Sequence, residues 1–194
     1  MERTDKTPER SHPQKNLHPY PKAHFPERLA CGNIELIRLS LRNDPGRFEE
    51  CLALYTKNRE HLKPWHYDRE ELQFKNSAAM KKYIKNNKLS WHAVYHAGTM
   101  AGLIELCWKD DEIRLAYWMD AEYTRRGIMH AAIAMTEQAL SGMGIDTVHA
   151  EILLTNEPSI KLLQKLNYET MWVSFHISES GQTMMATIIC QKIL

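Results

Sequence analysis

The chain has 194 residues, 43% of them hydrophobic, and 25 basic and 24 acidic residues leave a formal net charge of +1. This length suits one domain with one core, and the near-neutral charge argues against nucleic acid as the main ligand. The sequence shows no apolar run near the ~20 residues of a membrane helix and no secretory signal, so we expect a cytoplasmic protein. It also shows no metal-ligand spacing, so we expect no metal. The four cysteines lie far apart and are expected to be free thiols, at Cys31, Cys51, Cys107 and Cys190.

Residues 1–30 differ in composition from the rest of the chain. Prolines recur there among charged and polar residues, with few apolar anchors, at Pro8, Pro13, Pro21 and Pro26. This composition is typical of an extended or disordered arm. We therefore expect a flexible N-terminal arm over residues 1–30, dispensable for catalysis, and a folded domain over residues 31–194.

The first half of the folded region begins with a strand and continues with helices. A strand is expected over residues 34–41, and two or three helices are expected between residues 48 and 84, with Pro64 ending the second. Three strands follow, over residues 89–95, 100–108 and 112–119. In the last strand the period of two places apolar side chains on one face, at Ile113, Leu115, Tyr117 and Met119.

The second half alternates between helices and strands. A helix is expected over residues 128–139, a strand over 148–154, a helix after Asn156, and two strands over 168–177 and 183–194. The strand at 148–154 has apolar residues on one face, at Val148, Ala150, Ile152 and Leu154. This order indicates an α/β fold with a mixed sheet rather than a repeating βαβ array.

The segment after Met119 carries the pattern of an anion site. A strand runs into a basic loop that leads directly into a helix, whose first amides have no partners within the helix. The helix dipole favours negative charge there, Arg125 and Arg126 add positive charge, and Gly127 permits close approach of the backbone. These features favour a diphosphate site. An ordinary helix start with two solvated arginines is the alternative.

Four short motifs resemble the GNAT superfamily of acetyltransferases. Residues 124–129 (TRRGIM) resemble its acetyl-CoA signature, Q/R-x-x-G-x-G/A, with departures at Thr124 and Met129. The pair Asn156 and Ser159 resembles its N-x-x-S element, residues 165–168 (KLNY) resemble K-x-G-F, and residues 58–65 (NREHLKPW) resemble N-x-x-x-L-x-x-W. The four motifs follow the family's order within residues 34–194, and they are most similar to the Rim-type ribosomal-protein N-terminal acetyltransferases.

The resemblance implies a fold and a co-substrate. The fold is the GNAT fold, an α/β structure with a mixed, mostly antiparallel sheet of six or seven strands, flanked by helices and splayed between its fourth and fifth strands. The co-substrate is acetyl-CoA, with its pantetheine arm in the splay and its diphosphate on the basic turn. The implied cofactor-binding residues are Trp118, Met119, Thr124, Arg125, Arg126, Gly127, Ile128, Met129, His130 and Asn156.

The implied reaction is direct attack of an amine on the acetyl thioester, which requires a base and a proton for the leaving thiolate. Glu151 stands at the position of the catalytic glutamate in the alanine-specific Rim type, so it is the first candidate for the base. Alternatively, Glu151 is an ordinary solvent-facing residue of a half-exposed strand. Glu105, Glu112 and Glu179 are further candidates for the base. Many family members carry an acid tyrosine where this chain has Leu163, so Ser159 is the expected proton donor, with helix capping as its alternative.

The acceptor is expected near Trp65 and Tyr67, which fall in the segment that walls the acceptor site in this family; a satellite hydrophobic cluster is the alternative. Three other tryptophans, Trp91, Trp108 and Trp172, are expected in the core. The leading function is acetylation of a protein N-terminal amine, in particular of a ribosomal protein. Acetylation of a small amine (an amino acid, a polyamine or an antibiotic) and non-catalytic acyl-CoA binding are the alternatives. No nucleic-acid or membrane partner is expected, and a homodimer is left open.

Overall fold

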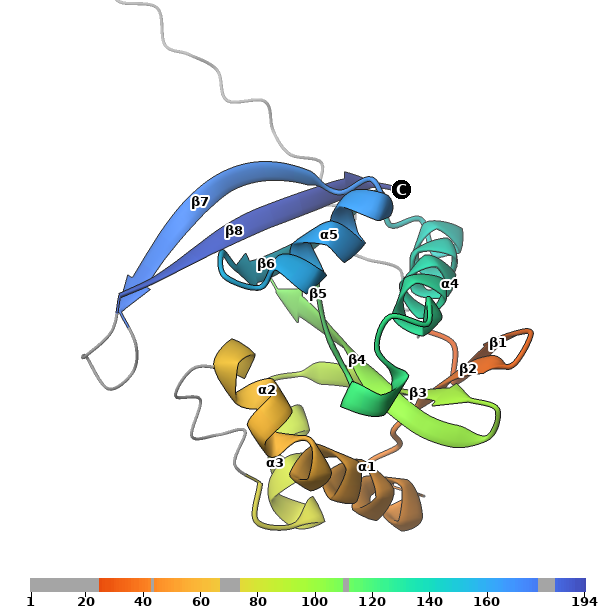
Figure 1. Cartoon of the computed structure of the whole chain (residues 1–194). Coiled ribbons are helices and arrows are strands. Elements are labelled where there is room, and N and C mark those ends of the chain that lie inside the picture. Colours follow the sequence, from red (N-terminus) through yellow and green to blue (C-terminus); the bar gives the residue numbers. More distant parts are fainter. Residues whose placement is uncertain (1–24, 43, 67–73, 110–111, 178–183) are drawn as a thin grey trace, which may run out of the picture.

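The computed structural model describes residues 25–42, 44–66, 74–109, 112–177 and 184–194 (Figure 1). The strands in these residues are β1 (Arg28–Cys31), β2 (Ile34–Arg38), β3 (Leu89–His96), β4 (Thr99–Lys109), β5 (Glu112–Met119), β6 (Thr147–Leu153), β7 (Glu169–Ile177) and β8 (Met184–Ile193). The α-helices are α1 (Pro45–Lys57), α2 (Arg59–His66), α3 (Ser77–Asn86), α4 (Ile128–Gly142) and α5 (Glu157–Lys165). None of the described helices is long and apolar enough to cross a membrane.

The strands form one mixed sheet in the order β1-β2-β3-β4-β5-β6-β8-β7. Neighbouring strands are antiparallel except β5 and β6, which are parallel. Helices α1, α2 and α3 lie on one side of the sheet, and α4 and α5 lie on the other (Figure 1). The expected α/β fold with a mixed, mostly antiparallel sheet is confirmed.

The sheet has eight strands within the described residues, where six or seven were expected. The unexpected strand is β1, which pairs with β2 from Arg28 opposite Ile37 to Cys31 opposite Ile34. Its four residues are mostly exposed and show no apolar alternation, so only the pairing with β2 defines it. Of the expected arm, residues 1–24 lie outside the described residues, whereas Phe25 is buried and its ring packs on His92.

Helix α2 continues past Pro64, so the expected stop at this residue is wrong. Pro64 removes one backbone donor from the last turn of a short helix whose neighbouring Leu62 is buried. Loss of one hydrogen bond at an exposed end is tolerated when the helix is held by such an apolar contact. The other expected helices and strands agree with the observed ones, apart from shifts at their ends.

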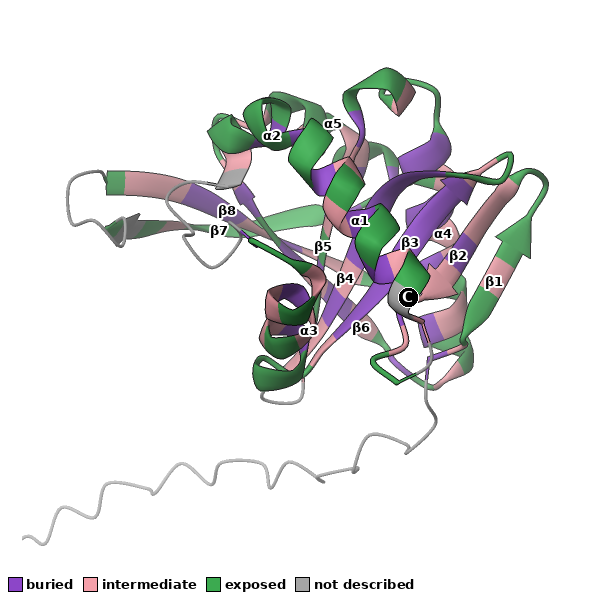
Figure 2. Ribbon diagram, turned by 90° about the horizontal axis from the view of Figure 1, so that it is seen from below, coloured by how far each residue is buried: buried purple, intermediate pink, exposed green. Residues whose placement is uncertain are grey.

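The two faces of the sheet carry separate hydrophobic cores (Figure 2). One core, with α4 and α5, contains Ile104, Ile113 and Ile133. The other core, with α1 and α3, contains Phe48 and Leu103. The expected apolar face of β5 and the inward residues Val148, Ala150 and Ile152 of β6 belong to the first core, whereas Leu154 lies beyond the end of β6 and is exposed.

The hairpin of β7 and β8 extends beyond the helices, and much of its surface remains exposed (Figure 2). The expected core position of Trp172 is wrong, because this residue is 55% exposed. A register shift between Thr170 and Trp172 marks an irregularity in the pairing of the two strands. The other large exposed side chains of the hairpin include Met171, Val173, Phe175, Ile177 and Met184.

Candidate active site

Strands β5 and β6 separate soon after they begin. They pair only at Ile113 with Val148 and at Arg114 with His149. Strand β5 remains paired with β4 as far as Met119, and β6 remains paired with β8 as far as Leu153. The expected splay therefore exists, and because of the additional strand β1 it lies between the fifth and sixth strands.

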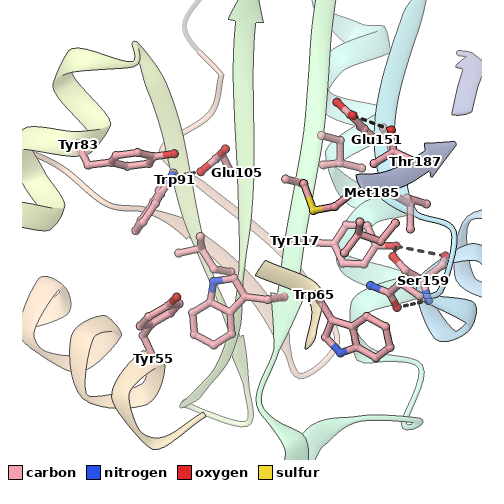
Figure 3. A pocket seen from close by; sticks show the side chains of 18 residues that line it. Tyr55, Trp65, Tyr83, Trp91, Glu105, Tyr117, Glu151, Ser159, Met185 and Thr187 are labelled. Atoms are coloured by element: carbon pink, nitrogen blue, oxygen red, sulfur yellow. Dashed lines mark hydrogen bonds between the residues drawn. The ribbon is translucent and has the colours of Figure 1, made fainter. Parts of the chain in front are cut away.

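A cavity of about 380 Å³ opens at this splay (Figure 3). Side chains alternate between the two faces of a strand, so neighbouring lining residues of β5 point in opposite directions. Tyr117 packs with the core of α4 and α5, whereas Trp118 packs with the core of α1 and α3. The cavity thus runs through the sheet and connects its two faces.

Aromatic side chains form much of the wall on the α1–α3 face. The rings of Tyr55 and Trp118 lie 5.7 Å apart between centroids, and those of Tyr83 and Trp91 lie 6.2 Å apart. Trp65 of α2, an expected acceptor residue, also lines the cavity. Tyr67, the other expected acceptor residue, lies outside the described residues.

Two carboxylates line the cavity on this same face, one on each side of the splay (Figure 3). Trp91 Nε1 donates a hydrogen bond of 2.6 Å to Glu105, and Thr187 Oγ1 donates one of 2.8 Å to Glu151. Both donors are neutral groups, and each orients the carboxylate that accepts its hydrogen bond. Sequence reasoning named both glutamates but not their donors.

The other two candidates for the base do not contribute to the described cavity. Glu112 lies at the opposite end of β5, within 3.6 Å of Arg114 and 3.8 Å of His149. Glu179 lies outside the described residues. Among the described residues, the carboxylates that line the cavity are therefore Glu105 and Glu151.

The first turn of α5 borders the cavity on the other face of the sheet. Asn156 caps this helix, because its side-chain oxygen accepts a hydrogen bond of 3.3 Å from the amide of Ser159. The hydroxyl of Ser159 lies 2.5 Å from the hydroxyl of Tyr117, and all three residues line the cavity. Leu163, at the position of the usual tyrosine, is buried in the core.

Tyr117 is a cavity residue that sequence reasoning assigned only to an apolar strand face. Burial raises the pKa of its phenol to about 12, although the hydrogen bond with Ser159 opposes that shift. The phenol is therefore neutral at physiological pH. The available sequence signal for this position was that Tyr117 lies two residues before Met119, in the strand that was expected to border the splay.

The basic turn begins α4 with two residues in the left-handed region. Gly127, the N-cap, has φ 75°, and Arg125 has φ 60°. Ile128 and Met129 are buried and anchor the helix start, whereas Arg125, Arg126 and His130 are exposed. The hydroxyl of Thr124 donates a hydrogen bond of 2.9 Å to the carbonyl of Ala121. The turn thus combines anchored backbone with exposed positive charge, which suits a diphosphate.

A polar contact ties this turn to the helices on the opposite face. The buried side chain of Asn58 donates to the carbonyl of Leu54 at 3.0 Å and accepts from the amide of Ala121 at 3.0 Å. Lys57 binds Asp120 at 2.9 Å. Burial would raise the pKa of Asp120, but the hydrogen bond from Lys57 and the other polar contacts lower it below its usual value. Asn58 and Lys57 therefore fix the loop that enters the turn.

The backbone of β5 approaches β4 closely beside the cavity. A Cβ atom on Gly102 would lie 2.4 Å from the carbonyl oxygen of Trp118. Because this contact is with backbone, no side-chain rotation relieves it. Gly102 therefore sets the position of the strand segment expected to bind the pantetheine arm.

Comparison with known proteins gives a family and a set of similar folds. Residues 38–169 match the family model of the acetyltransferase (GNAT) domain. The ribosomal-protein-S5-alanine acetyltransferase from Vibrio fischeri has a TM-score of 0.70 at 16% identity, over 86% of this chain and 96% of that chain. No curated protein sequence gives a significant match.

Two further solved structures have similar folds. An acetyltransferase from Salmonella typhimurium that modifies the N-terminal serine of ribosomal protein L7/L12 has a TM-score of 0.71 at 13% identity, over 84% of this chain and 96% of that chain. The microcin C7 self-immunity acetyltransferase MccE, in complex with acetyl-CoA and AMP, has a TM-score of 0.71 at 15% identity, over 84% of this chain and 93% of that chain. At these identities the likeness is one of fold.

Proposed function

The chain belongs to the GNAT acetyltransferase family, and we propose that it transfers the acetyl group of acetyl-CoA to the N-terminal amine of a protein, with ribosomal proteins as the substrate class. The observation that carries this proposal is the cavity through the splay, which has an aromatic, acidic wall on one face. The basic turn follows the cavity-lining end of β5 in the chain, but its residues 124–130 are not among the described lining residues. The ribosomal acceptors named for the Vibrio fischeri and Salmonella typhimurium enzymes support the substrate class.

Acetyl-CoA would bind through the backbone more than through side chains. The amides at the start of α4 would receive the diphosphate, with Arg125 and Arg126 adding positive charge. At Trp118 and Met119, β5 is paired with β4 on one edge, and its other edge, toward β6, is unpaired in the described structure; this unpaired edge would receive the pantetheine arm. The acetyl group would then lie within the splay, between Ser159 on one face and Glu151 on the other.

The protein groups in the cavity meet the demands of direct transfer. An N-terminal amine has a pKa of about 7.7 to 8.0, so it loses its proton readily to a carboxylate, directly or through water. We assign this role to Glu151, whose carboxylate is oriented by Thr187. Ser159 would supply the hydroxyl that meets the leaving sulfur. Acetyl-CoA itself supplies the activated thioester, so the reaction needs no covalent enzyme intermediate.

A small cationic amine is the second candidate acceptor. Glu105 and Glu151 face the cavity, and no lysine, arginine or histidine is among its described lining residues. A carboxylate-lined aromatic cavity attracts cations, which also favours a polyamine. A peptide would need to enter with one end only, past Trp65 and the β7–β8 hairpin.

The two acceptor classes are separated by thiol release from acetyl-CoA. The assay would compare peptides that differ in their first residue with a panel of amino acids, polyamines and aminoglycosides. Mass spectrometry of the products would show whether the α-amine carries the acetyl group, and peptides with a blocked α-amine serve as the control. Turnover confined to free peptide N-termini supports the proposal, turnover confined to polyamines replaces it, and stoichiometric acetyl-CoA binding without any turnover removes the enzyme function.

We further propose that residues 1–24 are dispensable and that the catalytic domain begins at Phe25, in a cytoplasmic protein. Phe25 packs on His92, and β1 adds an edge to the sheet. A protein that starts at residue 25 should therefore fold and turn over like the full chain. A protein that starts at residue 32 should melt at a lower temperature, because it lacks both features.

A further inference from the structure

The Tyr117–Ser159 contact joins two sides of the cavity that are distant in the sequence. Tyr117 extends from β5, and Ser159 lies in the first turn of α5 (Figure 3). Their hydroxyl oxygens are 2.5 Å apart, whereas the phenol is 3.4 Å from the carbonyl of Ser159. The short contact is thus with the side chain of the serine.

The direction of this hydrogen bond follows from the acidity of the two groups. Either hydroxyl can donate in this contact, and because a phenol has a pKa of about 10 in water and is a stronger acid than an aliphatic alcohol, donation by Tyr117 to Ser159 is favoured. This arrangement leaves the hydrogen of Ser159 able to point into the cavity. The opposite arrangement would direct that hydrogen at Tyr117 and leave the phenol only its contact of 3.4 Å.

Tyr117 does not itself supply the proton in this arrangement. Burial raises the pKa of its phenol to about 12, whereas a free thiol has a pKa of about 8.5. A thiolate is therefore too weak a base to remove the proton of Tyr117. The phenol remains a hydrogen-bond donor throughout, and its dipole strengthens the donor character of the serine hydroxyl.

We propose that Tyr117 is a positioning residue that directs the Ser159 hydroxyl at the sulfur leaving acetyl-CoA. This inference rests on the proposed function, because it needs the acetyl thioester beside Ser159. When the carbon–sulfur bond breaks, its electron pair moves to sulfur, which accepts the hydrogen bond of Ser159. The amine attacks in its neutral form and then loses one proton to Glu151, which releases that proton to solvent. The thiolate gains one proton through Ser159, which takes a replacement from solvent, so the protons balance.

A double-mutant cycle on Tyr117→Phe and Ser159→Ala tests the coupling. Tyr117→Phe should lower kcat about tenfold and leave acetyl-CoA affinity and acceptor KM unchanged, because it removes one hydrogen bond from a positioned donor. In a Ser159→Ala background the same change should have no effect on kcat. Tyr168→Phe is the matched control, since Tyr168 is also buried but does not line the cavity.

The outcomes separate this inference from the proposed function. Independent, multiplicative losses in the double mutant, or a Tyr117→Phe enzyme with normal kcat, would overturn the role of Tyr117 alone. A wild-type protein that releases no thiol with any acceptor, or with water, would overturn the proposed function as well. If Tyr117→Phe does not fold, a fluorinated tyrosine at position 117 keeps the ring and the hydroxyl but makes the phenol a stronger acid. This replacement should change kcat in the wild-type background and not in the Ser159→Ala background, and an equal change in both backgrounds would overturn the inference.

Discussion

The two sides of the cavity are built in different ways. The side assigned to acetyl-CoA comes mostly from one continuous segment, the end of β5, the basic turn and the start of α4, and it offers mainly backbone and positive charge; the first turn of α5 adds Asn156 and Ser159. The side assigned to the acceptor comes from side chains on α1, α2, α3 and five strands, β3, β4, β5, β6 and β8, and it offers aromatic rings and carboxylates. An unchanging co-substrate can be held by backbone, whereas a particular acceptor must be recognised by side chains.

Glu151→Gln should have the largest effect and should act on the acceptor side alone. The amide keeps the size of the side chain but cannot take a proton, so turnover at neutral pH should fall about 10²-fold. Acetyl-CoA affinity should remain unchanged in an equilibrium titration. The loss in turnover should shrink above pH 8, where the amine is increasingly neutral without help.

The matched change for this prediction is Glu105→Gln, on the other side of the splay. It should raise KM for a cationic acceptor more than it lowers kcat, because Glu105 attracts the acceptor without reaching the reacting amine. If Glu105→Gln shows the large kcat loss and Glu151→Gln does not, the role of base belongs to Glu105.

Gly127→Val should have the next largest effect and should act on the acetyl-CoA side alone. Gly127 has φ 75°, a conformation that a β-branched residue adopts only with strain. The turn should open, and the Kd of acetyl-CoA should rise about tenfold or more. Gly98→Val is the control, since Gly98 has φ 81° in a hairpin turn. Equal losses of stability with an unchanged Kd in both variants would contradict the role of the turn.

Gly102→Ala should disturb both sides through the strand between them. The added methyl would meet the carbonyl oxygen of Trp118, so the strands must move apart at a cost of about 1–3 kcal/mol in stability. Both thermal unfolding and acetyl-CoA titration should report the change. Gly142→Ala is the control, because a Cβ at Gly142 meets no atom within 4 Å. Its melting temperature should not fall.

Asn58→Ala should have the smallest effect and should test the link between the two sides. It leaves the amide of Ala121 without its acceptor, at a cost of about 1–2 kcal/mol. Asn87→Ala is closely matched, because Asn87 also ends a helix and donates to the carbonyl four residues earlier, at Tyr83. Both variants should lose some stability, and only Asn58→Ala should also weaken acetyl-CoA binding. Unchanged binding in Asn58→Ala would show that the turn holds its position without this contact.

Sequence reasoning succeeded where a feature is continuous in the chain. The basic turn, the strand before it and the helix after it could be predicted because their period and composition are local. The inward face of β6 and the opposite direction of Glu151 followed from alternation along one strand. The pairing-defined strand β1 could not be predicted, since Arg28–Cys31 has no pattern of its own.

Contacts between segments that are distant in the sequence could not be predicted on either side of the cavity, for a related reason. Trp91 and Glu105 meet through the register of β3 and β4, and Tyr117 meets Ser159 through the packing of α5 on the sheet. Neither contact is encoded by spacing along the chain. Such pairs form only in the tertiary structure, which cannot be predicted from the local sequence pattern.

The most direct test of this account is the crystal structure of the protein bound to a bisubstrate, a peptide whose N-terminal amine is joined through an acetyl linker to coenzyme A. We expect the diphosphate against the amides at the start of α4, the linker between Ser159 and Glu151, and the peptide beside Trp65 and Glu105. A conjugate that lies wholly on one face of the sheet, or outside the splay of β5 and β6, would contradict the claim that one cavity brings co-substrate and acceptor together from opposite faces.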